Sequence, residues 1–191
     1  MHMIEPFFSW RQYYIASEDP RSPFFGRAYS ETELTHAIYN YLIHPQWDLF
    51  GSNTLVAKVL YVNYEQEYTV IELMGEWNDV LYNDIMYLKS NLMDPMYKNG
   101  VKRFVLIGEN VLNFHGAEDD YYQEWYEDIR DAGYIFMLCF QPHVITEFLE
   151  TGLDQYLCIP SKENEIVNWR IFEPLQLKKI IEKYYLLLSP V

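Results

Sequence analysis

The sequence predicts an α/β domain built on a mixed β-sheet, with helices packed against the sheet. Half of the 191 residues are hydrophobic, which is enough for a chain of this length to bury a substantial core. Residues 55–73 have the pattern of a β-hairpin, in which two strands rich in β-branched and aromatic residues flank a polar turn. Beyond the hairpin, the short apolar runs 103–107 and 134–140 alternate with helical patterns, as expected for strands covered on both faces.

The N-terminal part of the chain has a different composition. We expect residues 1–53 to form an aromatic-rich extension with one helix, packed on the main body. Residues 54–191 are expected to form the α/β domain with a C-terminal helix, so that the whole chain is one globular unit. Three prolines within residues 1–29 argue against a long helix there. The aromatic side chains of this segment are expected to pack on the main body or on a second subunit.

The helix of the extension is predicted after residue 30. Ser30-Glu31-Thr32-Glu33 has the pattern of a capping box, in which the serine and the second glutamate satisfy free N–H groups at a helix start. The apolar residues that follow share one helical face, and Pro45 ends the run: Leu34, Ile38, Tyr41 and Leu42.

The hairpin and the helix after it are predicted from local signals. Strands are expected at 55–64 and 68–73, and Gly75 is expected to end the second strand. Asn78 or Asp79 can cap the next helix, in which apolar residues recur at intervals of three and four. The predicted inward face of this helix holds Leu81, Ile85, Leu88 and Leu92. Pro95 is a candidate kink, and Asn99-Gly100 is a typical helix end.

Strands and helices are expected to alternate in the C-terminal half. A helix is predicted between Gly116 and Gly133, and its inward residues are Tyr122, Trp125, Tyr126 and Ile129. After the buried strand at 134–140, Pro142 is well placed to start a helix that ends near Gly152. The remaining elements are short strands at 156–159 and 166–172 and a final helix that begins at Pro174.

The charge of the chain excludes one class of partner. With 28 acidic and 14 basic residues, the formal net charge is −14, and a surface of this charge repels nucleic acid. A partner with a basic or apolar segment fits better. The acids gather in two runs that contain no Lys or Arg, one between Lys58 and Lys89 and one between Arg103 and Arg130. We interpret both runs as solvated faces.

Three further observations indicate a cytoplasmic protein. No apolar run approaches the length of a membrane span. The first residues lack the basic region and apolar core of a secretory signal. Cys139 and Cys158 each lie in an apolar segment, which is typical of reduced cysteines in a core.

Three segments of the chain resemble the STAS domain, the fold of anti-sigma-factor antagonists. Residues 68–77 resemble that family's strand ending in a Gly-Glu-Leu-Asp-like turn, and residues 100–107 resemble its central strand. Residues 132–153 resemble its last strand and helix. The resemblance implies a STAS-like mixed sheet with helices packed on it, extended at both ends of the chain. It also implies a regulatory role in binding another protein.

The family's regulatory serine has no counterpart here. In STAS domains of this type the central strand leads to an Asp-Ser-Ser-Gly-like turn at a helix N-terminus, and a kinase phosphorylates the serine. The matching segment is Asn113-Phe114-His115-Gly116, and Phe114 has no hydroxyl group. Residues 91–145 contain no Ser or Thr. The three acids at 118–120 would also repel a phosphate. We therefore expect the phospho-switch to be absent.

The residues around this segment form the predicted partner-binding face. An acidic and aromatic surface suits a partner segment that is basic and apolar. The candidate residues are Asn113, Phe114, His115, Gly116, Glu118, Asp119, Asp120, Tyr121 and Trp125, with Trp77 and Asp79 adjacent if the family's layout holds. The sequence contains no phosphate loop, nucleophile elbow or other motif of catalysis, and implies no cofactor.

Two alternatives remain open at this point. His115 and Asp119 are four residues apart, a spacing that could place two metal ligands on one face of a helix. With the neighbouring carboxylates they would form a small-molecule or metal site, which could be hydrolytic. The other alternative is self-association as a homodimer through the aromatic residues of the segment 1–29.

Overall fold

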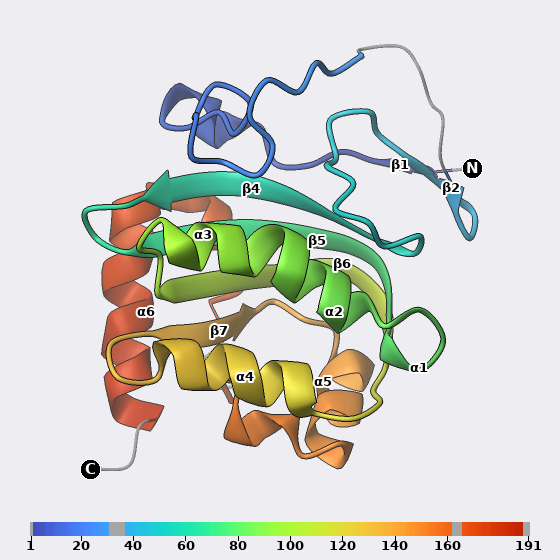
Figure 1. The fold of residues 1–191 in the computed structure, drawn as a ribbon, viewed down its shortest axis with the longest axis vertical. Coiled ribbons are helices and arrows are strands. Elements are labelled where there is room, and N and C mark those ends of the chain that lie inside the picture. Colours follow the sequence, from blue (N-terminus) through green and yellow to red (C-terminus); the bar gives the residue numbers. More distant parts are fainter. Residues whose placement is uncertain (1, 31–36, 162–165, 189–191) are drawn as a thin grey trace.

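The computed structural model describes residues 2–30, 37–161 and 166–188. Its central feature is a four-stranded sheet with the strand order β4-β5-β6-β7 (Figure 1). The antiparallel hairpin of β4 and β5 is followed by parallel pairing of β5 with β6 and of β6 with β7. The mixed sheet predicted from the sequence is therefore confirmed. Its strands are β4 (Leu55–Asn63), β5 (Tyr68–Asn78), β6 (Arg103–His115) and β7 (Tyr134–Leu138).

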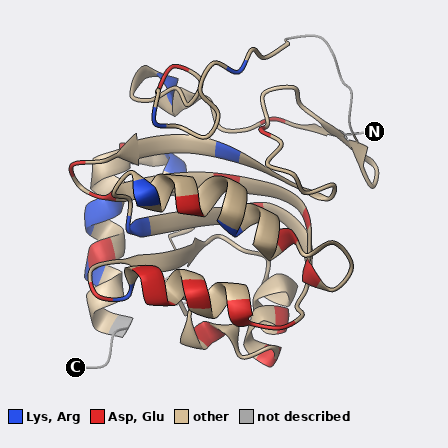
Figure 2. Cartoon of the chain, viewed as in Figure 1, with Lys and Arg blue, Asp and Glu red and all other residues tan. Residues whose placement is uncertain are grey.

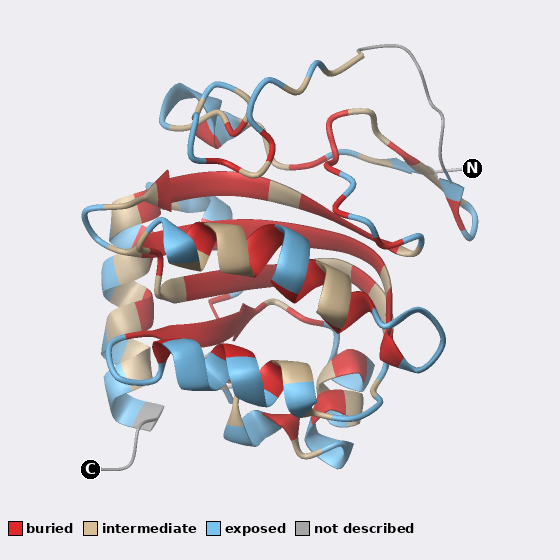
Figure 3. Ribbon diagram, viewed as in Figure 1, coloured by how far each residue is buried: buried red, intermediate tan, exposed pale blue. Residues whose placement is uncertain are grey.

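Helices cover both faces of this sheet. One face carries α2 (Asp84–Leu88), α3 (Asp94–Lys98), α4 (Asp120–Ile129) and α5 (Pro142–Glu150), with the π-helical turn Lys89–Met93 between α2 and α3. The opposite face carries α6 (Pro174–Leu188), whose buried residues pack on those of β5 and β6. Figure 3 shows the sheet buried between these two layers. In the described part of the chain, no helix has the length and apolar character needed to cross a membrane.

The N-terminal extension forms a small sheet, which corrects the predicted helix over its described part. Strands β1 (His2–Ile4), β2 (Ala37–Ile38) and β3 (Tyr41–Ile43) pair in the order β1-β3-β2. Tyr39, with φ of +52°, turns the chain between β2 and β3. Ile38 and Ile43 are buried against the central sheet, and β3 pairs with β1. These contacts with distant parts of the chain favour strands over the helix that the apolar spacing predicts. Most of the capping-box motif falls at 31–33, outside the described residues.

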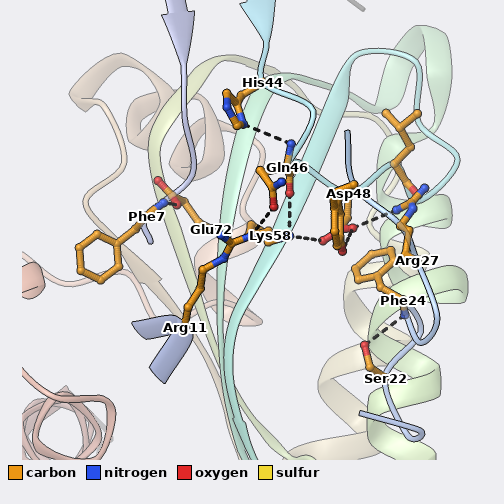
Figure 4. A network of polar contacts seen from close by, with 12 residues as sticks. Phe7, Arg11, Ser22, Phe24, Arg27, His44, Gln46, Asp48, Lys58 and Glu72 are labelled. Atoms are coloured by element: carbon orange, nitrogen blue, oxygen red, sulfur yellow. Dashed lines mark hydrogen bonds and ion pairs between the residues drawn. The ribbon is translucent and has the colours of Figure 1, made fainter. Parts of the chain in front are cut away.

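Aromatic residues of the first 29 positions pack on the main body. Trp10 lies edge-on to Trp169, with ring centroids 5.4 Å apart, and its indole N–H donates to the carbonyl of Phe172. The N–H of Phe7 donates to the buried carboxylate of Glu72 on β5, at 2.9 Å. Figure 4 shows this contact beside a polar network that includes Lys58 and Asp48. The extension is thus joined to the body by both apolar and polar contacts.

Two predicted boundaries near the end of β5 are wrong. Gly75 does not end the strand; with φ of +122° it lies at an irregularity of the pairing, and β5 runs on to Asn78. A Cβ atom at Gly75 would lie 2.1 Å from the carbonyl oxygen of Thr54, so the close approach requires glycine. The helix expected from Asp79 is interrupted by Asn83, which has φ of +52° and separates α1 (Asp79–Tyr82) from α2.

The other outcomes concern the C-terminal third. The helices that begin at Pro142 and Pro174 are confirmed. The strand predicted at 156–159 is reduced to a single bridge between Cys158 and Phe136. Within 166–172 the described backbone forms a short 3₁₀ turn, Trp169–Ile171, because Trp169 is buried against α6 and the N-terminal aromatic residues.

Candidate functional site

The candidate residues gather where the parallel strands β5 and β6 end. Asn78 at the end of β5 lies opposite His115 at the end of β6, and Trp77 lies opposite Phe114. Helix α1 follows β5 directly, and α4 follows β6 after a short loop (Figure 1). In open α/β sheets, ligands and partners commonly bind outside the carboxyl ends of the strands. Of the two residues that the resemblance places beside this segment, Trp77 pairs with Phe114, and Asp79 follows two residues later at the start of α1.

Phe114 belongs to the core of the protein. Its side chain is 1% exposed and stacks on Phe148, with ring centroids 3.8 Å apart, while Trp77 meets it edge-on at 6.0 Å. Its N–H donates to Oε2 of Glu147 at 3.0 Å. The residue lies within β6, whereas α4 begins only at Asp120. The matching position is therefore in a strand and not in a turn at a helix N-terminus.

Three more candidate side chains are buried and cannot contact a partner in this conformation. They are Trp77, Asp79 and Trp125. Trp77 and Trp125 fill the core between the sheet and the helices, where Trp125 meets Phe104 edge-on at 5.2 Å. The proposed surface must therefore exclude these residues together with Phe114.

Asp79, the first residue of α1, anchors this helix to the core through its buried carboxylate. Its Oδ2 accepts a hydrogen bond from the hydroxyl of Tyr122 at 2.6 Å, and its Oδ1 accepts from the N–H of Ile85 at 2.8 Å. Burial raises the pKa of Asp79 to about 6, against the opposing effect of these hydrogen bonds. Asp84 has a related role at the start of α2, where its Oδ2 accepts from the N–H of Asn78 at 2.7 Å. Burial raises the pKa of Asp84 as well.

The exposed part of the site is apolar. Three consecutive residues of α1 project into solvent: Val80 is 60% exposed, Leu81 71% and Tyr82 42%. Tyr39, in the turn between β2 and β3, is 57% exposed and lines a hollow of about 370 Å³ with Leu112 and Asn113. A hydrogen bond to Glu76 raises the pKa of Tyr39 and links this turn to β5. We call these exposed residues, Tyr39, Val80, Leu81 and Tyr82, the α1 face.

Charged groups border the α1 face. Nε2 of His115, a half-exposed residue, lies 3.2 Å from Oε1 of Glu76. Glu118 and Asp120 are exposed at the start of α4, and Figure 2 shows acidic residues continuing along that helix. Asp119 accepts a hydrogen bond from the hydroxyl of Tyr156 at 2.7 Å. The loop residue Gly116 and Tyr121 of α4 are partly exposed.

The spacing argument for a metal site does not hold in the structure. His115 lies in β6 and Asp119 precedes α4, so the two residues do not share a helical face. His115 contacts Glu76, and Asp119 contacts Tyr156. Among the described residues, no group of three or more His, Cys, Asp or Glu side chains is arranged to hold a metal ion.

Sequence reasoning missed the α1 face because it assigned Leu81 to the inward face of one continuous helix. The signal that could have revealed the break is Asn83, since asparagine tolerates the left-handed conformation that ends α1. Tyr39 was assigned to the helix predicted after residue 30. Its left-handed backbone conformation, which few residues adopt, instead forms the turn between β2 and β3.

Comparison with known proteins gives a likeness at the level of the fold. No protein-family model matches the chain, and no curated protein matches it in sequence. Among solved structures, the anti-sigma factor antagonist SpoIIAA in its unphosphorylated form is similar over 61% of this chain and 98% of its own, with 17% identity and a TM-score of 0.44. The Bacillus cell fate determinant SpoIIAA in the phosphorylated form is similar over 56% of this chain and 93% of its own, with 16% identity and a TM-score of 0.39.

Proposed function

We propose that this chain is a non-enzymatic, STAS-like regulatory module that binds a protein partner at the α1 face and works without a serine phospho-switch. The observation that carries the proposal is the exposure of three consecutive residues of α1, Val80, Leu81 and Tyr82. Tyr39 is also exposed, and its hydrogen bond to Glu76 holds it at the end of the strand that leads into α1. Apolar side chains that cluster on a surface commonly mark a protein interface. Tyrosines add contact area at a small cost in conformational entropy.

The rigidity of α1 supports this interpretation. Asn78 caps the helix by accepting from the N–H of Leu81 at 2.9 Å, and Asp79 anchors its first turn to Tyr122 and Ile85. A four-residue helix has little stability of its own, so these buried contacts fix its position. A surface that is already ordered loses less entropy on binding.

The charges beside α1 indicate the chemistry of the partner. Glu118, Asp120 and Glu127 are exposed on or before α4, whereas Lys89 pairs with Glu124 and Asp128 of the same helix. The stretch 104–129 itself contains no Lys or Arg. Such a field attracts a basic segment and accelerates its association. We therefore propose a partner segment in which an apolar side chain enters the α1 face and neighbouring Lys or Arg residues lie over α4.

The surroundings of Phe114 support the absence of the family's switch. Its ring packs among the rings of Phe148 and Trp77, so a phosphate group at this position would lie in an apolar core. Burying a doubly charged group there without cationic partners is strongly unfavourable. Regulation in this chain, if it uses the same strand end, must act through partner binding itself.

A site-specific cross-linking experiment tests the proposal. A photoreactive amino acid is placed at Leu81, and a matched control carries it at Ile171, which is also apolar and exposed but lies on the 3₁₀ turn before α6. The partner captured from Leu81 is then purified, and its affinity is measured for wild type, Leu81→Glu and Ile171→Glu. We expect Leu81→Glu to weaken binding by about tenfold or more and Ile171→Glu to leave it unchanged.

The same measurements separate the alternatives. Binding should weaken as salt is raised, because the contribution of α4 is electrostatic. Equal affinity for wild type and Leu81→Glu would disprove the α1 face as the contact surface. A cross-link from position 81 to a second copy of this chain would show that the α1 face is a homodimer interface and not a binding site for a different protein.

A further inference from the structure

A second hollow lies away from the α1 face, beside the edge strand of the central sheet, where Cys158 bridges to Phe136. Its volume is about 600 Å³, within the range that binds small molecules. Strand β7 is the edge strand of the sheet, and its first residues, Tyr134 and Ile135, line the hollow together with Gly133 before it. The other walls come from the end of α4, one face of α5, residues 154–161 and Tyr185 of α6.

The wall from α5 is apolar and accessible. Val144 and Phe148 face the core, which turns Ile145 and Leu149, one helical turn apart, toward the hollow. Leu149 is 48% exposed, although a leucine beside the core would ordinarily be covered. An apolar ligand that covered Leu149 and Ile145 would remove this surface from water.

The opposite wall is aromatic and lies in a negative field. The rings of Tyr126 and Tyr156 have centroids 5.9 Å apart and are tilted by 54° to each other. Tyr156 donates to Asp119, and this contact, together with nearby Asp120 and Glu127, raises the pKa of Tyr156. Negative charge behind aromatic rings favours a cation over their faces.

The charges of the lining point the same way. Asp154 is the charged residue among the described ones that line the hollow, and none of those is Lys or Arg. Arg103 and Arg130 line a neighbouring hollow that shares Gly133, Tyr134 and Tyr185 with this one. A carboxylate or phosphate would therefore meet a carboxylate and phenol rings here, without a cation from the described lining.

We infer that this hollow binds a small apolar molecule with a positively charged group. The apolar part lies on Ile145 and Leu149, and the cation lies by Tyr126, Tyr156 and Asp154. Such a ligand matches both the apolar wall and the aromatic wall with its negative field. The site shares no residue with the α1 face, so it is independent of the proposed partner interface.

Two probes of equal length but opposite charge test the inference. Octylammonium and octanoate are titrated into the full-length protein, and binding is followed by calorimetry and by NMR shifts of Ile and Leu methyl groups. We expect octylammonium to bind, to shift the methyl signals of Ile145 and Leu149, and to bind more tightly than octanoate. Failure of octylammonium to bind, or equal or tighter binding of octanoate, would overturn the inference.

Paired variants locate the site. Leu149→Arg places a positive charge at the mouth of the hollow on an exposed side chain, and should weaken octylammonium binding by roughly tenfold. Leu81→Arg, a matched change on the α1 face, should leave this binding unchanged. Thermal unfolding of both variants checks that they are folded. If folded Leu149→Arg binds octylammonium as wild type does, the ligand does not occupy this hollow.

Discussion

Replacing Glu72 by glutamine is expected to stabilise the protein at neutral and alkaline pH. Glu72 lies in the middle of β5 and is 1% exposed. Its carboxylate accepts from the N–H of Phe7 at 2.9 Å and has a longer contact, 3.5 Å, with the side-chain amide of Asn110. Burial raises the pKa of Glu72 to about 7, because these partners do not replace the water that an ionised carboxylate loses.

The size and sign of the effect follow from this pKa. An increase from 4.5 to about 7 corresponds to about 3 kcal/mol, at 1.36 kcal/mol per pKa unit. Between these pH values the folded protein keeps a proton that the unfolded chain has released, so stability falls as pH rises through the window. The stability associated with the protonated Glu72 is fully present below the unfolded pKa and is lost above the folded pKa. Glutamine does not titrate and keeps an oxygen for the N–H of Phe7.

Denaturant unfolding of wild type and Glu72→Gln at about pH 4.5 and about pH 8 measures this effect. The two proteins should have nearly equal free energies of unfolding at the lower pH, and the variant should be about 3 kcal/mol more stable at the higher pH. Glu65→Gln, an exposed carboxylate in the hairpin turn, is the control and should show no such difference. A variant that is less stable than wild type at pH 8, or a difference that does not depend on pH, would refute the reasoning.

Three further predictions concern the core around the site. Tyr122→Phe should lower the free energy of unfolding by about 1.5–3 kcal/mol above pH 6, because Asp79 loses a donor at 2.6 Å; urea unfolding measures it, and a loss within error would contradict the role of Asp79. Phe114→Ser should cost about 3–5 kcal/mol rather than create a switch, since it empties a stacked aromatic position; an unchanged melting temperature would show that Phe114 is not a core residue. Trp10→Ala should cost a similar amount, about 3–5 kcal/mol. Because Trp10 is buried and does not form an association surface, light scattering should give the same molecular mass for the variant and the wild type.

The central sheet could be predicted from the sequence because its strands are encoded locally. Apolar runs between turn signals gave the starts of β4, β5, β6 and β7 close to those observed. The ends of β5 and β6 were predicted too early. Both strands continue through irregular pairing, at Gly75 and beyond Ile107, where long-range contact with the neighbouring strand decides the conformation. Such contacts are not visible in a local pattern.

The errors at Phe114 and Leu81 have this same origin. Since β6 runs on to His115, Phe114 faces the core from a strand and does not occupy a turn. Leu81 fits an inward helical spacing, yet one left-handed residue, Asn83, rotates α1 away from α2 and turns Leu81 outward. The sequence therefore predicted that the candidate residues gather at this end of the sheet, but it did not separate the buried residues from the exposed ones.

The two acidic runs, interpreted alike from the sequence, have different roles in the structure. In the first run, Glu72, Asp79 and Asp84 are buried, where they bind backbone N–H groups and hold the N-terminal extension, α1 and α2. In the second run, Glu118 and Asp120 are exposed at the start of α4, and Glu124 and Asp128 farther along the helix pair with Lys89. Net charge alone thus overstates the field of the first run, and the proposed attraction of a basic partner rests on the exposed acids of the second run. Reversal of charge on α4 should therefore slow association with the partner, whereas neutralising Glu72 should change stability and leave the association rate unaltered.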